Sequence, residues 1–132
     1  MNEFLNPKSW RRPGGYSNAV TAKGRTVYIA GQIGWNADER FETDDFAGQV
    51  RQALDNIKAC LEVSGAAPEH IVRLTWFVTD KQEYLNQLDQ VGQAYRETLG
   101  RCFPAMSLVQ VADLLEDRAK VEIEATAVIP EP

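Results

Sequence analysis

The sequence predicts a single α+β domain, spanning residues 1–132, in which two helices cover one face of a mixed β-sheet. In two separate segments, apolar residues recur at spacings of three and four, which is the period of an amphipathic helix. Shorter segments are rich in β-branched residues or alternate between apolar and polar positions, as strands do. The order of these elements is β-β-α-β-α-β-β, and no linker or internal repeat divides them.

The first half of the chain holds two expected strands and one helix. Residues 17–21 are typical of a short strand, and residues 26–31 form a β-rich segment that ends at a glycine. A polar loop leads to the helix, which Thr43 or Asp44 can cap, and Gly65 stands just past its end. The apolar stripe of this helix consists of Phe46, Val50, Leu54, Ile57 and Leu61.

The second half opens with a strand and a second helix. Residues 71–78, IVRLTWFV, are too apolar for a half-exposed strand. Asp80 and Glu83 match a capping box at the start of the following helix, which ends at Gly100. The apolar stripe of this second helix consists of Leu85, Leu88, Val91, Tyr95 and Leu99.

Two further strands, residues 105–112 and 120–128, complete the expected sheet. In the last strand Glu122 and Glu124 alternate with apolar residues, so that both carboxylates share one face. Because two helices cannot cover both faces of the sheet, an apolar face remains open, which is typical of a protein with a partner subunit. The apolar residues expected on this open face are Met106 and either Leu108 or Val109.

Composition excludes several classes of function. The chain has 14 Lys and Arg against 19 Asp and Glu, a net charge of −5, and a pI of about 4.9. Binding to nucleic acids or anionic membranes needs clustered basic residues, which an acidic chain does not favour. No apolar run approaches the roughly 18 residues of a membrane span, and the N-terminus lacks an apolar signal core. We therefore expect a cytoplasmic protein with two reduced cysteines and without nucleic-acid or membrane partners.

Few side chains suit metal or nucleophilic chemistry. The one histidine, His70, cannot form a histidine pair, and the spacings of common metal motifs and phosphate loops are absent, so we expect no metal and no cofactor. Cys60 fits packing better than catalysis, and Cys102 is a weak nucleophile candidate. The carboxylates Glu122 and Glu124 remain. Either they form a solvent-exposed strand face, or one of them is buried at a subunit boundary as a general acid or base.

Six stretches resemble, in the same order, those of one known family. They are GGYSNAV at 14–20, YIAGQIG at 28–34, QVRQALDNIKACLEVSGA at 49–66, VRLTWFVTD at 72–80, FPAMS at 103–107 and KVEIEATAV at 120–128. The chain thereby resembles the RidA family (YjgF/YER057c/UK114), whose members deaminate reactive enamines and imines. The resemblance implies a chorismate-mutase-like α+β fold and a homotrimer whose sheets line a central barrel. It also implies three ligand clefts between neighbouring subunits.

The resemblance implies roles for some residues, and at other positions this sequence departs from the family's pattern. It implies that Glu122 orients the attacking water, that Tyr16 lines the cleft and that the backbone of Gly31 faces the ligand. The family's PARS motif supplies an Arg that clamps the substrate carboxylate, whereas the sequence here is PAMS, with Met106 at the Arg position. The other departures are Ala30 in place of Ser, Gly92 in place of Asn and Leu108 in place of Cys.

Because the Arg is missing, the identity of the ligand stays undetermined. An Arg contributes about 1.5–3 kcal/mol through each charge-assisted hydrogen bond to a carboxylate, and Met106 offers none. The usual 2-imino acid should bind poorly unless another cation replaces the Arg. Arg101 is the nearest candidate in the sequence, although a plain surface arginine explains it better. Trp35 either walls the pocket or anchors its loop.

Two functions therefore stay open. The first is hydrolytic deamination of an enamine or imine that presents no carboxylate at the usual place, such as an aminomuconate-like catabolic intermediate. The second is non-catalytic, trimeric binding of a small apolar or aromatic ligand. The retained Glu122 favours the enzyme, and the loss of four cleft residues favours the binder. A ribonuclease activity, which has been attached to relatives, receives little support from an acidic chain without a basic stripe.

Overall fold

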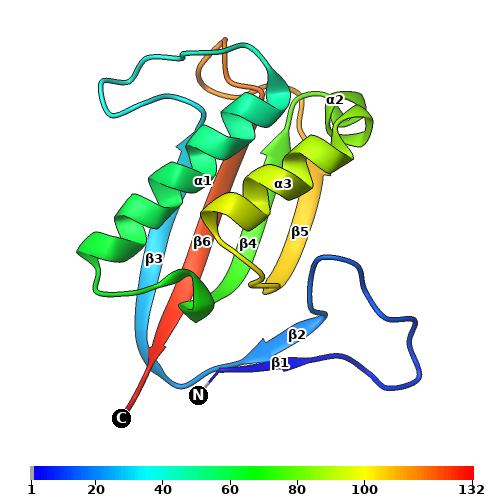
Figure 1. Ribbon diagram of the computed structural model, residues 1–132, viewed down its shortest axis with the longest axis vertical. Helices are drawn as coiled ribbons and strands as arrows, with labels where there is room; N and C mark the ends of the chain where they lie inside the picture. Colours follow the sequence, from blue (N-terminus) through cyan, green and yellow to red (C-terminus); the bar gives the residue numbers. More distant parts are fainter. Residues whose placement is uncertain (1) are drawn as a thin grey trace.

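The computed structural model describes residues 2–132 and places three helices on one face of a four-stranded sheet (Figure 1). The predicted α+β layout is thereby confirmed. The sheet contains, in spatial order, β3 (Gly24–Ile33), β6 (Val121–Pro130), β4 (Ile71–Val78) and β5 (Ala105–Gln110). The helices are α1 (Phe46–Val63), α2 (Lys81–Asn86) and α3 (Leu88–Thr98), and a separate two-stranded sheet pairs β1 (Glu3–Leu5) with β2 (Ala19–Thr21).

The pairing of the strands makes the sheet mixed, as predicted. β6 lies between β3 and β4 and is antiparallel to both, whereas β4 and β5 are parallel. The parallel pair needs a crossover connection, and α2 and α3 supply it. Of the expected strands, only that at 71–78 has the observed bounds. The expected strand at 17–21 begins two residues later, and that at 105–112 ends two residues earlier.

Helix α1 has the predicted stripe but a different cap. All five stripe residues are buried, because they face the sheet. The N-cap is Asp45, one residue beyond the predicted pair, and its carboxylate accepts a hydrogen bond from the N–H of Gly48 at 2.9 Å. Thr43 supports this cap by accepting from the N–H of Asp45 at 3.0 Å. Gly65 adopts φ +76°, which confirms its position just past the helix.

The second predicted helix is wrong as a single helix, because it is broken at Gln87. The Gln87 side chain accepts from the N–H of Ala47 at 2.9 Å and donates to the carboxylate of Asp45 at 3.1 Å, so it satisfies the start of α1. With the helix broken there, Leu85 and Leu88 are about half exposed and do not extend the buried stripe.

The predicted capping box of α2 is formed only in part. The Asp80 carboxylate accepts from the N–H of Gln82 at 2.9 Å, rather than from that of Glu83. The Glu83 carboxylate turns away from the helix start and pairs with the ammonium of Lys120 at 2.8 Å. A tertiary ion pair thus replaces the local contact that the spacing predicted.

The residues expected on the open sheet face require a correction. Met106 pairs with Leu74 and Leu108 with Trp76, and both β4 residues are buried beneath the helices. Met106 and Leu108 therefore face the helices, because paired residues share a face. Val109, paired with Phe77, lies on the open face and is 44% exposed.

Gln49 links α1 to the segment that precedes β6. Its side chain is fully buried, donates to the carbonyl oxygens of Thr43 at 3.2 Å and Arg118 at 3.0 Å, and accepts from the N–H of Lys120 at 2.9 Å. The amide nitrogen and the amide oxygen of Gln49 thus both bond to loop segments. Since Lys120 immediately precedes β6, this one side chain fixes where the last strand begins.

Replacing Gln49 by Leu should destabilise the protein strongly, because two carbonyl groups and one N–H would lose their partner in the interior. We expect the free energy of unfolding to fall by about 2 kcal/mol or more in urea titrations at matched protein concentration. The control is Gln52→Leu, since Gln52 bonds only to Asn56 within the same helix. Equal losses in the two variants would contradict the assigned role.

Candidate functional site

Glu122 and Gly31 come together where β3 and β6 lose their regular pairing. The register shifts between Ile29 and Gln32 of β3, so Ala30 and Gly31 form a bulge. A Cβ atom on Gly31 would lie 2.7 Å from Cδ of Glu122 and 2.9 Å from Cγ. The Glu122 carboxyl group therefore occupies the space that a side chain at residue 31 would take.

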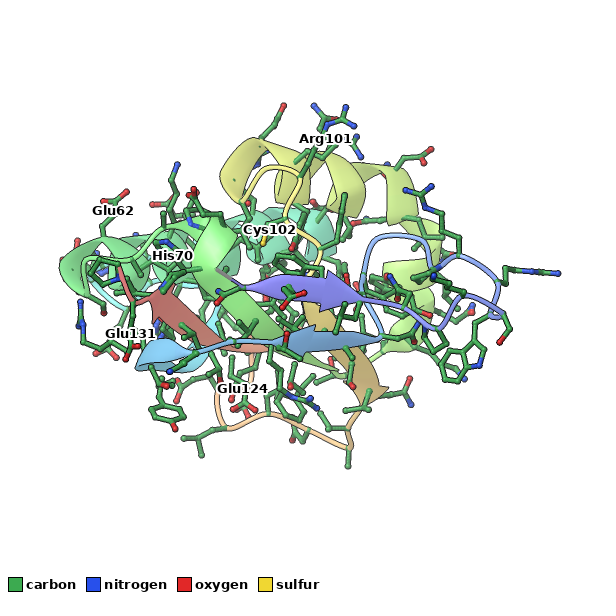
Figure 2. All side chains as sticks on the ribbon, turned by 90° about the horizontal axis from the view of Figure 1, so that it is seen from below. Glu62, His70, Arg101, Cys102, Glu124 and Glu131 are labelled. Atoms are coloured by element: carbon green, nitrogen blue, oxygen red, sulfur yellow. The ribbon has the colours of Figure 1, made fainter. Side chains whose placement is uncertain are left out.

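The Glu122 carboxylate lies on the open face of the sheet. It is partly buried, whereas Glu124, two residues along the same strand, is exposed. Figure 2 shows Glu124 on the side of the sheet that faces away from the helices. Neither carboxylate has a hydrogen-bond partner among residues 2–132, so both are free to meet groups supplied from outside this chain.

Tyr16 is held beside the start of β5 by its neighbour Ser17. The Ser17 hydroxyl donates to the carbonyl oxygen of Phe103 at 2.6 Å, and the Ser17 N–H donates to that of Pro104 at 3.0 Å. The Tyr16 ring is 38% exposed and borders a small hollow together with Gly15 and Phe103. The loop 14–17 is thus tied to the segment that carries Met106.

Met106 and Leu108 line a cavity of about 190 Å³ between β5 and the α2–α3 layer, which we call the Met106 cavity. Trp76 and Phe103 add aromatic walls, and Gly14 and Gly15 close one side. Helix α3 contributes Val91, Gly92, Tyr95 and Arg96. Met106, Leu108 and Gly92, which lie on β5 and α3, therefore line one largely apolar cavity.

One chain does not bring all the predicted residues together. The Met106 cavity opens on the helix side of the sheet, whereas Glu122 and Gly31 lie on the other side. Ala105 pairs with Arg73 and Glu122 with Phe77. These partners are four residues apart on β4, which places Ala105, the residue beside Ser17, and Glu122 about 13 Å apart along the strand direction. A site that uses both groups needs a second copy of the chain.

Trp35 and Arg101 do not line the Met106 cavity. Trp35 packs against Phe41 with ring centroids 6.0 Å apart, and its carbonyl oxygen accepts from the Asn56 amide at 2.8 Å, so it anchors its loop. Arg101 lies on the helix side of the molecule, in a different hollow that it shares with Glu69 and Cys102 (Figure 2).

Arg96 is the charged residue of the Met106 cavity, and the sequence analysis did not identify it. Its place four residues after Gly92, on one face of α3, is the signal that could have identified it.

The remaining candidates have structural roles. Burial and the nearby charge of Glu69 raise the pKa of Cys102 to about 11, and its thiol donates to the carbonyl oxygen of Pro68 at 3.0 Å. Cys102 is therefore a neutral thiol near pH 7. His70 accepts from the N–H of Ala67 at 3.0 Å, in a single 3-10 turn at Pro68–His70.

Among residues 2–132, no three His, Cys, Asp or Glu side chains cluster as metal ligands. None of the helices described has the length and apolar character needed to cross a membrane.

Comparisons with known proteins agree on one family. The model of the Endoribonuclease L-PSP family matches residues 9–129. A protein of Dermatophagoides farinae named 2-iminobutanoate/2-iminopropanoate deaminase is 37% identical over 117 residues, which cover 88% of this chain and 87% of that protein.

Two solved structures extend the agreement to the fold. YyfB of Yersinia pestis, described as a protein of the conserved Rid family, has a TM-score of 0.86 at 33% identity, covering 97% of this chain and 98% of that one. Rv2704 of Mycobacterium tuberculosis, described as a member of the YjgF/YER057c/UK114 family, has a TM-score of 0.64 at 35% identity, covering 87% of each chain. The chain belongs to the RidA (YjgF/YER057c/UK114) family, which the Endoribonuclease L-PSP model describes.

Proposed function

We propose that this protein is a hydrolase that deaminates a reactive enamine or imine in a cleft between two copies of the chain. One copy supplies Glu122 and Gly31, and the next supplies Tyr16 and the Met106 cavity. The observation that carries this proposal is the Glu122 carboxylate, which sits in the gap left by Gly31 on an open sheet face and has no hydrogen-bond partner within residues 2–132.

The chemistry requires a general base and a way to remove ammonia. Glu122 accepts a proton from water while the water oxygen bonds to the imine carbon, and the C=N electron pair moves to the nitrogen. The protonated Glu122 returns this proton to the nitrogen, which gives a neutral carbinolamine. Glu122 then carries the hydroxyl proton of the carbinolamine to the nitrogen, the C–N bond breaks with its electron pair leaving on ammonia, and the carbonyl forms. Imine and water thus yield carbonyl compound and ammonia, and the regenerated carboxylate is ready for another cycle. Tyr16 holds the substrate, and an enamine first tautomerises to the imine.

The apolar Met106 cavity narrows the class of substrate. The relative from Dermatophagoides farinae is named for imines that carry a carboxylate next to the imine carbon. Met106 and Leu108 offer no donor to such a group, and burying a carboxylate against them without a partner costs several kcal/mol. We therefore assign to this chain an imine with an apolar body and without a carboxylate at the usual place, an aminomuconate-like catabolic intermediate being one example.

A non-catalytic binder is the second candidate. The four replaced cleft residues favour it, because they exchange polar groups for apolar side chains or none. The acidic chain, with a net charge of −5, gives no matching support to ribonuclease activity despite the description of the family model.

The proposed cleft requires an assembly, and we expect a homotrimer. The open sheet face carries Tyr28, which is 82% exposed, and Val109, which is 44% exposed, so apolar surface is available for burial. Sedimentation equilibrium at micromolar concentrations should give three times the chain mass of 14.8 kDa. A stable monomer under these conditions would contradict the shared cleft.

Substitution of Glu122 tests the mechanism directly. Glu122→Gln keeps the shape of the side chain but removes the base, so kcat on imines generated in situ should fall by about 100-fold or more. Glu124→Gln is the matched control on the same strand and should stay within about twofold of the wild type. If Glu122→Gln turns over substrate normally as an intact trimer, Glu122 has no part in the mechanism.

Substitution of Met106 tests the substrate class. The wild type should deaminate 2-iminobutanoate poorly, and Met106→Arg should raise kcat/KM for it by about tenfold or more through new charge-assisted hydrogen bonds. Met106→Leu is the control that keeps the cavity apolar. Wild-type rates equal to those of an Arg-containing relative would show that the missing Arg is compensated. Unchanged, negligible rates in Met106→Arg would show that the other replaced residues also matter.

A further inference from the structure

The Met106 cavity contains one charged side chain among its lining residues, that of Arg96. Two tyrosines, Tyr84 and Tyr95, also border it, and burial raises the pKa of both, so neither is anionic near neutral pH. The Tyr95 hydroxyl already donates to the carbonyl oxygen of Cys102. The cavity therefore presents a single positive charge and no negative one.

The position of the Arg96 guanidinium is set by Gly92. A Cβ atom on Gly92 would lie 3.2 Å from Nη1 of Arg96, so the guanidinium lies over the glycine, one turn back toward the helix start. Arg96 belongs to the last turn of α3, where a basic residue often interacts with the terminal carbonyl groups. Its guanidinium lies back along the helix, as helical side chains ordinarily do, and this direction places it beside the cavity that it lines.

The Arg96 guanidinium has no ion-pair or hydrogen-bond partner among residues 2–132. The neighbouring acid, Glu97, pairs instead with Arg51 and accepts from the Gln93 amide at 3.2 Å. Five donor N–H groups of a guanidinium at the edge of an apolar cavity are thus left for a ligand.

We infer that Arg96 is a specificity-determining residue that binds an anionic group, such as a carboxylate, of a ligand whose apolar body fills the Met106 cavity. This inference rests on the proposed function for the identity of the site and refines its substrate class. The charge lost at Met106 on β5 is replaced by one on α3, at a different wall of the cavity. The preferred ligand therefore carries its carboxylate at the far end of an apolar body and not beside the reacting carbon.

Phenylpropanoate and its uncharged amide, phenylpropanamide, are suitable probes because they differ only in the anionic group. In equilibrium titrations followed by NMR or calorimetry, the wild type should bind the carboxylate about tenfold or more tightly than the amide. Arg96→Gln should abolish this preference while binding of the amide stays the same. Arg96→Lys should keep part of it, since the charge remains and the planar fork is lost.

Two further variants separate this role from a structural one. Arg101→Gln removes another exposed Arg of the same segment, which lies in a different hollow, and should leave the preference intact. Gly92→Ala keeps the charge but displaces the guanidinium and should weaken carboxylate binding. A preference that survives Arg96→Gln, an equal loss in Arg101→Gln, or no preference in the wild type would each overturn the inference.

The titrations involve no turnover, so they stand apart from the proposed function. If Arg96→Gln loses the preference and the wild type deaminates no imine, the proposed deaminase function is contradicted and the anion site at Arg96 is supported. If deamination depends on Glu122 but the preference is unaffected by Arg96→Gln, only the anion site at Arg96 is contradicted and the deaminase function is supported.

Discussion

The fit between the Glu122 side chain and the missing side chain of Gly31 is the constraint on which the site depends. It requires a bulge in β3, because regular pairing would leave no gap at Gly31. It also requires β6 to begin at the correct residue, and the buried amide of Gln49 fixes that start through Lys120. A core side chain of α1 thus controls where a carboxylate stands on the opposite face of the sheet.

The sheet itself separates the two halves of the site. Side chains alternate along β6 and β5, so Glu122 projects from the open face while Met106 and Leu108 project toward the helices. No side-chain rotation moves a group from one face of the sheet to the other. Assembly is consequently a chemical requirement of the proposed function, since only a second copy can place a carboxylate against the Met106 cavity.

The Met106 cavity has mainly apolar walls and one charged lining residue. Met106, Leu108 and Gly92 leave apolar walls, and the guanidinium of Arg96 lies over Gly92. The Arg96 side chain is exposed at the edge of this space, so its charge can meet an ionic ligand that extends out of the cavity. On the proposed function, we expect a small 2-imino acid to bind poorly and a longer ligand to bind better.

The sequence by itself determined the α+β class, the helix-α1 stripe, the bounds of β4 and the alternation that puts Glu122 and Glu124 on one face, because these follow from local periodicity. The position of Met106 was predicted wrongly, since the face of an edge strand depends on its register with β4. The break at Gln87 and the orientation of Arg96 were decided by the tertiary structure alone. Gln87 interrupts its helix to cap α1, and Arg96 lies at the exposed edge of a space between α3 and β5. Such contacts join residues distant in sequence, and no local pattern encodes them.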